Sequence, residues 1–264
     1  MKNWCFKESN KRARVDLWDS MAKSFGEEAL PTFENSSFLR LLEREKMFNG
    51  ASPVLDVGCG AGGYSIALSG RCREVIGIDL SPRMIETAKR RAGKQNADNI
   101  RFFCADWHEL DLEREKLSRR FDLVFAHMTP AVQSADTFLK LSQASRGWCV
   151  LSKPTRRTDP VSDEVKRLVG ISEKRESSDR DILYAFTLLW EQRLLPHLEY
   201  ERQQWDMRKT PEEAYGLYVN RVKTYREITP EEEQRIVRFL ESITKDGVIC
   251  ETVDTTITTL YWHV

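Results

Sequence analysis

The chain is poor in the side chains that usually bind metals. It has four histidines and six cysteines among 264 residues, and the cysteines occur singly, without a C-x-x-C pair or a neighbouring histidine. Zinc sites need paired ligands at short spacing, so we expect no metal. Isolated cysteines are typical of reduced thiols, which fits a cytoplasmic protein.

Long apolar runs are also missing. No stretch approaches the roughly 20 residues that span a membrane as a helix. The amino-terminal segment MKNWCFKESNKRAR has no apolar signal sequence. We therefore expect a cytoplasmic protein without a membrane partner.

The chain has no net charge, because 41 Lys and Arg residues balance 41 Asp and Glu residues. No overall field draws it toward nucleic acid, so we do not expect a nucleic-acid partner. A length of 264 residues can bury the core of one domain with a cap. We expect that domain to be a monomer or a homodimer.

Glycines crowd one short segment, PVLDVGCGAGG, at residues 53–63. They follow an apolar strand pattern, and they let the backbone turn sharply and a ligand approach closely. Gly58, Gly60 and Gly63 also satisfy the G-x-G-x-x-G pattern of dinucleotide sites. The glycines therefore indicate a nucleotide-type ligand without identifying it.

An acid, Asp56, stands two residues before the first of these glycines. In a dinucleotide site, the turn and the following helix N-terminus bind a pyrophosphate, which a carboxylate would repel. S-adenosylmethionine has no phosphate, and its sulfonium and α-ammonium groups attract a carboxylate. Asp56 therefore favours S-adenosylmethionine over NAD.

The run Asp56-x-Gly58-x-Gly60-x-Gly62 resembles the first motif of the class I S-adenosylmethionine-dependent methyltransferases. The segments EVIGIDLSPRMIETAKRRA, IRFFCADWHEL and FDLVFAHMTPAV resemble the next strands of that family, in the expected order. The motifs cover about residues 50 to 155. The resemblance implies a doubly wound α/β fold, with a mostly parallel seven-stranded sheet, an antiparallel last strand and helices on both faces.

The rest of the chain is expected to surround this core within one methyltransferase domain. We predict an N-terminal helical cap over 1–50, a Rossmann-like core over 51–210, a helical insertion over 211–246 and a final edge strand over 247–264. Two capping boxes, TPEE at 210–213 and at 229–232, predict the starts of the insertion helices. A polar loop with a short helix is expected over 153–179, and a helix over 181–195.

The resemblance also implies a donor site. Asp79 would hold the ribose hydroxyls, while Asp106 and Trp107 would face the adenine. Trp18 would close over the donor, and Met84 would lie over the adenine. Such acids can instead cap helices, and Trp18 and Met84 can instead be core residues. The predicted donor-binding residues are Trp18, Asp56, Gly58, Cys59, Gly60, Gly62, Asp79, Leu80, Met84, Ala105, Asp106, Trp107, His127 and Met128.

Methyl transfer is an in-line displacement, and positioning supplies most of its acceleration. A general base is needed only where the acceptor must lose a proton. His127, just after the fourth strand, is the best-placed candidate, with a donor-lining role as its alternative. Lys153, Arg156 and Arg157 could bind an acceptor carboxylate or phosphate, unless they are solvated loop charges.

We therefore predict an enzyme that transfers a methyl group from S-adenosylmethionine to a small molecule and leaves S-adenosylhomocysteine. The first alternative is an RNA or protein methyltransferase that uses the basic segments KRRAGK and EREKLSRR. The turn HMTP departs from the Asn/Asp-Pro-Pro-aromatic pattern of enzymes that methylate nucleic-acid amines. The second alternative is a non-catalytic protein that binds S-adenosylmethionine.

Overall fold

The computed structural model describes residue 4 and residues 10–171 and 176–264. Residues 1–3 and 5–9 of the predicted cap and 172–175 of the predicted loop lie outside the described residues. The strands are β1 (Pro53–Val57), β2 (Glu74–Asp79), β3 (Ile100–Cys104), β4 (Phe121–His127), β5 (Ser145–Thr158), β6 (His197–Lys209) and β7 (Ile249–His263). The helices are α1 (Lys11–Glu27), α2 (Ser37–Arg44), α3 (Gly63–Ser69), α4 (Pro82–Lys94), α5 (Ala135–Ala144), α6 (Pro160–Leu168), α7 (Glu176–Glu191), α8 (Pro211–Lys223) and α9 (Pro230–Ile243).

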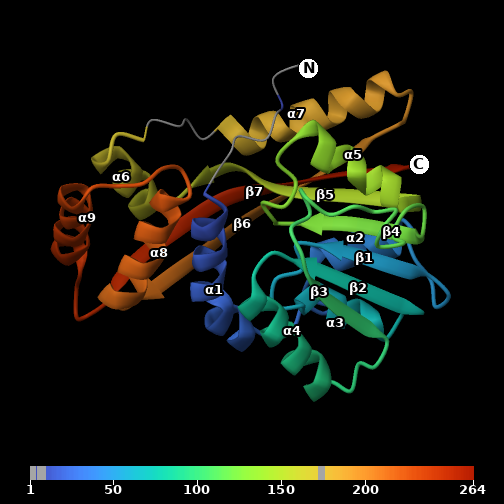
Figure 1. Cartoon of the computed structure of the whole chain (residues 1–264), viewed down its shortest axis with the longest axis horizontal. Helices are drawn as coiled ribbons and strands as arrows, with labels where there is room; N and C mark the ends of the chain where they lie inside the picture. Colours follow the sequence, from blue (N-terminus) through green and yellow to red (C-terminus); the bar gives the residue numbers. More distant parts are fainter. Residues whose placement is uncertain (1–3, 5–9, 172–175) are drawn as a thin grey trace.

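The seven strands form one sheet in the order β3-β2-β1-β4-β5-β7-β6 (Figure 1). Strands β1 to β5 pair in parallel, whereas β7 runs antiparallel to both β5 and β6. The predicted doubly wound fold with an antiparallel last strand is confirmed. The strand order reverses between β1 and β4, and such a switch point leaves a crevice at the carboxyl ends of the strands.

Helices cover both faces of the parallel strands, so these strands are apolar on both sides. Leu123 and Phe125 of β4 pack in the cluster that contains α2 and α3. Val124 and Ala126 point the other way, into the cluster with α5 and α7. This alternation follows from the two-residue period of a strand. It decides which helices each side chain of the strand packs against.

The last three strands are longer than the others, and α6, α8 and α9 gather on the part that projects beyond the core (Figure 1). Val161 of α6, Tyr218 of α8 and Ile236 of α9 share a buried apolar cluster, which Leu17 of α1 joins. The two helices between β6 and β7 are the predicted helical insertion. Their packing on α1 joins the N-terminal helices to the far end of the sheet.

The predicted polar loop after the fifth strand is wrong in its first part. Strand β5 continues to Thr158, because its residues from Trp148 to Thr158 pair with β7. Helix α6 follows at Pro160–Leu168, and α7 begins at Glu176, earlier than the predicted Asp181. A polar sequence can form a strand where a neighbouring strand provides hydrogen-bond partners for its backbone N–H and C=O groups. The sequence pattern of one segment does not reveal such a pairing.

Both capping boxes of the insertion are present. The Thr229 hydroxyl accepts a hydrogen bond from the backbone N–H of Glu232, and the Glu232 carboxylate accepts one from the Thr229 N–H. We expect Thr229→Ala to lower the free energy of unfolding by about 1 kcal/mol, because α9 loses its cap. In thermal unfolding this is a drop of about 2–4 °C. Thr229→Ser keeps the hydroxyl and should unfold close to the wild-type temperature; an equal drop in both variants would contradict the capping role.

Candidate active site

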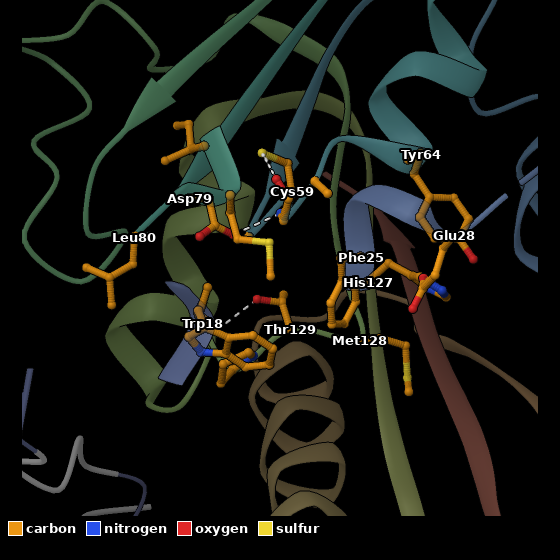
Figure 2. Close-up of a pocket in the computed structure, with 18 of the residues that line it drawn as sticks. Trp18, Phe25, Glu28, Cys59, Tyr64, Asp79, Leu80, His127, Met128 and Thr129 are labelled. Atoms are coloured by element: carbon orange, nitrogen blue, oxygen red, sulfur yellow. Dashed lines mark hydrogen bonds between the residues drawn. The ribbon is translucent and has the colours of Figure 1, made fainter. Parts of the chain in front are cut away.

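A cavity of about 440 Å³ lies where the glycine-rich turn and the ends of the parallel strands meet α1. Its walls come from residues directly after β1, β2, β3 and β4, from α1 and from the segment that leaves α1. The size lies within the range of small-molecule sites. Figure 2 shows Asp79 and Leu80 on one side of the cavity and Phe25, Glu28, Tyr64 and His127 on the other.

Asp79, the last residue of β2, joins the strand end to the glycine-rich turn. Its carboxylate accepts hydrogen bonds from the backbone N–H of Gly60, at 2.8 Å, and of Ser81, at 2.9 Å. Desolvation by burial raises the pKa of Asp79 above its usual value. Each carboxylate oxygen keeps a lone pair beyond these bonds, so Asp79 can accept hydroxyl donors from a ligand.

Asp106 lies just past β3, at the same edge of the sheet. Its Oδ2 atom lies 3.5 Å from Nη2 of Arg14 and 3.7 Å from Nζ of Lys11, both on α1. Its Oδ1 atom accepts the backbone N–H of His108. Asp106 therefore ties the roof of the cavity to the strand end on which the adenine was predicted to lie.

Helix α1 forms that wall of the cavity and carries Trp18, whose closure over the donor stays a prediction. Trp18 and Phe25 pack with Met84 of α4 in one small cluster at the cavity. Asp19 of α1 accepts hydrogen bonds from the Ser81 hydroxyl and from the backbone N–H of Arg83, at the N-terminus of α4. These contacts hold α1 in place over the glycine-rich turn.

Arg91 of α4 fixes the other end of the roof. Its guanidinium donates hydrogen bonds to the carbonyl oxygens of Phe25 at 2.9 Å, Ala61 at 3.2 Å and Glu28 at 2.8 Å. One cationic side chain thus binds the end of α1 and the glycine-rich turn together. These guanidinium N–H groups are therefore occupied by backbone carbonyls in the wall of the cavity.

His127, at the end of β4, sits in a packed aromatic cluster. Its ring centroid lies 4.0 Å from that of Phe38 and 4.5 Å from that of Tyr64. Its Nδ1 atom is buried and has no hydrogen-bond partner among the described residues. Desolvation by burial lowers the pKa of His127 to about 3, so the imidazole is neutral near neutral pH. A neutral ring can accept a hydrogen bond or a proton from a bound group.

The low pKa of His127 predicts a specific pH dependence of stability. In the unfolded chain His127 takes up a proton below about pH 6.5, but in the folded protein it does so only near pH 3. The folded state therefore loses stability as the pH falls below 6.5, by at most about 1.4 kcal/mol per pH unit. We expect the urea midpoint of wild type to fall more steeply than that of His127→Phe between pH 6.5 and pH 4.

Both proteins in this comparison keep Asp56, whose buried carboxyl has a pKa raised to about 7 by desolvation. That group makes the protein less stable as the pH rises from about 4 to 7, which is the opposite direction. Its contribution cancels in the difference between the two proteins. Parallel pH curves would show that His127 titrates alike in the folded and unfolded states.

Asp56 itself does not line the cavity. The residue is 3% exposed, and its carboxylate accepts a hydrogen bond from the Ser65 hydroxyl at 2.7 Å. Gly62 is likewise absent from the cavity wall. Its backbone has a φ of +77°, and a Cβ there would lie 2.9 Å from both Ala88 and Phe102. Neither residue reaches the cavity wall, so Asp56 can act on a donor only through its charge or through water, and Gly62 acts by shaping the turn.

Trp107 differs from its predicted orientation. The residue contributes to the cavity wall, but it is 2% exposed and its indole packs in the main core cluster. The indole N–H donates a hydrogen bond to the carbonyl of Thr137 at 2.9 Å. Trp107 therefore borders the cavity while most of its ring packs in the core, and its contact with the adenine stays a prediction.

The three cations predicted for acceptor binding lie outside the cavity wall. Lys153 is buried, donates to the carbonyls of Thr129 and Val132, and lies 3.8 Å from Asp181. Arg156 pairs with Asp179, and Arg157 pairs with Asp159. Their carboxylate and carbonyl partners are protein groups, so the geometry gives them no free path to an acceptor.

The other predicted residues do line the cavity. They are Trp18, Gly58, Cys59, Gly60, Asp79, Leu80, Met84, Ala105, Asp106, His127 and Met128. Sequence reasoning missed Phe25, Glu28 and Tyr64 on the side opposite Asp79, and it missed Gln203 among the lining residues. Tyr64 directly follows the glycine-rich segment, and this position could have identified it as a lining residue. Gln203 comes from β6, and only the folded chain brings it here.

Two further properties concern the described part of the chain. No helix there is long and apolar enough to span a membrane. Nor do those residues form a group of three or more His, Cys, Asp or Glu side chains arranged to hold a metal ion.

A family model described as a methyltransferase domain matches residues 54–146. A 23S rRNA (uracil(1939)-C(5))-methyltransferase, RlmD from Shewanella amazonensis, is 34% identical over 103 residues, which is 39% of this chain and 21% of that protein. A tRNA (guanine-N(7)-)-methyltransferase from Rubrobacter xylanophilus is 38% identical over 72 residues, 26% of this chain and 32% of that protein. The chain thus spans a third or less of these two relatives.

Solved structures share the fold. The phosphoethanolamine N-methyltransferase 2 of Haemonchus contortus, solved with phosphomonomethylethanolamine and S-adenosylhomocysteine, matches with a TM-score of 0.52 and 17% identity. The match covers 95% of this chain and 57% of that one. The family-model match spans β1 to β4, whose ends carry Asp79, Asp106 and the glycine-rich turn. Residues 54–146 are therefore a methyltransferase domain with the fold of the class I S-adenosylmethionine-dependent methyltransferases.

Proposed function

We propose that this protein is an enzyme that transfers a methyl group from S-adenosylmethionine to a small-molecule acceptor. The observation that carries the proposal is that one cavity is lined by Asp79 and Asp106 at strand ends and also by Tyr64, His127 and Glu28. A donor held on the first side leaves the second side for an acceptor. The donor would be released as S-adenosylhomocysteine.

Different lining residues would hold different parts of the donor. Asp79 would accept the ribose hydroxyls, and Asp106 would hold the adenine side with Arg14 at the roof. The backbone of Gly58 and Gly60 lets the donor's amino-acid portion approach closely. The bound donor supplies a methyl group that is already activated by the sulfonium charge. Alignment of nucleophile and methyl then supplies the larger share of the acceleration.

His127 would serve the acceptor in its neutral form. Its place in the aromatic cluster fixes the ring, and its low pKa keeps it uncharged. A neutral imidazole can accept a hydrogen bond from an acceptor N–H or O–H and orient it, although a pKa of about 3 makes the ring a weak base. If the acceptor reacts without losing a proton, His127 would only line the acceptor side of the cavity.

Calorimetric titration with S-adenosylmethionine, S-adenosylhomocysteine and NAD tests the donor. Binding of the two sulfur ligands without NAD would support the proposal, and preferential binding of NAD would overturn it. Release of S-adenosylhomocysteine only when acceptors are supplied would exclude a non-catalytic binding protein.

An acceptor in RNA is the second candidate. The rRNA and tRNA methyltransferases among the relatives favour it, so the expectation of no nucleic-acid partner has no support from the comparisons. The balanced charge of the chain favours a small molecule. A salt-sensitive gel shift with bulk RNA would favour RNA, whereas no shift at low salt would favour the small molecule.

A further inference from the structure

The side of the cavity opposite Asp79 is built from aromatic rings and one acid. Phe25, Tyr64 and His127 stand there together with Glu28 (Figure 2). The ring contacts of Tyr64 and His127 with Phe38 hold two of these rings in fixed orientations. Aromatic faces combined with a carboxylate are a favourable environment for an amine or ammonium group.

The Glu28 carboxylate is the charged group that stands at this side. It forms no ion pair with any other described residue. Desolvation raises its pKa, and the nearby Arg91 charge lowers it. Glu28 remains exposed at the mouth of the cavity. An entering cation would therefore meet a carboxylate that protein partners have not neutralised.

Neighbouring charges add to the negative character of this side. Desolvation raises the pKa of the Tyr64 hydroxyl, and the charges that raise it further all belong to acids, Glu201 and Asp56 before Glu28. Two cations, Arg14 and Arg91, also line the cavity. Arg14 lies beside Asp106, and Arg91 donates to three backbone carbonyls. An anionic acceptor would therefore meet repulsion at Glu28, and the Arg91 guanidinium, whose donors are occupied by backbone carbonyls, would offset it only in part.

We propose that the acceptor is a small amine, whose nitrogen is recognised by the Glu28 carboxylate among the rings of Phe25, Tyr64 and His127. This assignment rests on the proposed function of the cavity. It narrows the acceptor from any small molecule to one that carries a primary or secondary amine beside an apolar group.

The chemistry balances with the groups that are present. An amine that enters as an ammonium ion gives one proton to the Glu28 carboxylate, which exposes the nitrogen lone pair. That lone pair forms the N–C bond to the methyl carbon, while the S–C bond breaks and its electron pair stays on sulfur. The products are the methylated ammonium ion and neutral S-adenosylhomocysteine. The proton on Glu28 leaves to solvent at the cavity mouth.

The test uses three probes of one shape and different charge: benzylamine, benzyl alcohol and benzoate. Each is titrated into the full chain saturated with S-adenosylhomocysteine, after binding of S-adenosylhomocysteine has been established alone. We expect benzylamine to bind at least about tenfold more tightly than the other two, since one charged contact is worth roughly 1.4 kcal/mol or more. Glu28→Gln should remove this preference.

Glu27→Gln is the matched control, because Glu27 is an exposed acid at the end of the same helix and does not line the cavity. It should bind benzylamine like the wild type. Equal or weaker binding of benzylamine relative to benzoate, or an unchanged preference in Glu28→Gln, would overturn the amine assignment. Failure to bind S-adenosylhomocysteine in the first step would instead overturn the proposed function.

A turnover screen gives the second readout, with release of S-adenosylhomocysteine measured for sets of amines, phenols and carboxylic acids. Turnover confined to amines, and reduced at least about tenfold in Glu28→Gln, supports the inference. Turnover with phenols or carboxylic acids alone would overturn it while leaving the methyltransferase proposal intact.

Discussion

Replacement of Gly58 by alanine is expected to abolish measurable binding of S-adenosylmethionine and to destabilise the fold. Gly58 has a φ of +72°, and a Cβ there would lie 1.9 Å from the Thr129 hydroxyl oxygen and 2.6 Å from the Thr129 Cβ. The left-handed backbone costs about 1–2 kcal/mol for a non-glycine residue, and overpacking costs about 1–3 kcal/mol more. Urea unfolding should show that loss, and calorimetry should show the loss of donor binding.

The control for this substitution is Gly93→Ala. Gly93 lies in α4, and a Cβ there meets nothing within 4 Å. Alanine in a helix interior is better than glycine by about 0.5–1 kcal/mol, so this variant should be slightly more stable and bind the donor normally. Wild-type donor affinity in Gly58→Ala would show that the turn has room to shift without harm to the site.

Asp79→Asn should lower the affinity for S-adenosylmethionine by about 100-fold. The wild-type carboxylate accepts from the N–H groups of Gly60 and Ser81, and the asparagine amide would turn a donor toward one of them. One unsatisfied N–H costs about 1–3 kcal/mol, and a lost charge-assisted bond to a ribose hydroxyl adds a similar amount. Titration calorimetry on the variant measures the change directly.

Asp98→Asn is the matched control, because Asp98 is an exposed acid away from the cavity. It should keep the wild-type affinity. A drop of less than about threefold in Asp79→Asn, less than 1 kcal/mol, would mean that Asp79 holds the turn without touching the donor.

The two sides of the cavity have different origins in the chain. The donor side comes from β1, β2 and β3, which lie within the residues matched by the family model. The side proposed for the acceptor takes Phe25 and Glu28 from the N-terminal cap, outside that match, and the cavity also takes Gln203 from β6. The family match therefore predicts which donor is bound. It does not predict the acceptor, which depends on residues outside the matched region.

Asp56 shows how far a motif can be interpreted from sequence. The acid before the glycines correctly indicated the family, yet its carboxylate points to Ser65 inside the fold. Residues alternate between the two faces of a strand, and the depth of each one depends on helices from elsewhere in the chain. Core contacts likewise decide where the side chains of Trp107 and Lys153 lie, which their positions in the sequence do not reveal.

The sequence by itself determined the family, the order of strands and helices, and the strand ends that carry Asp79 and Asp106. These features follow from local patterns: apolar runs, glycines that permit a left-handed turn, and capping residues. Only the tertiary structure decided that Glu28, Tyr64 and His127 share one side of a cavity, and that β5 continues into the predicted loop. Those outcomes depend on contacts between residues far apart in the chain, such as the pairing of β5 with β7 and the hold of Arg91 on α1. No pattern within a single segment records such contacts.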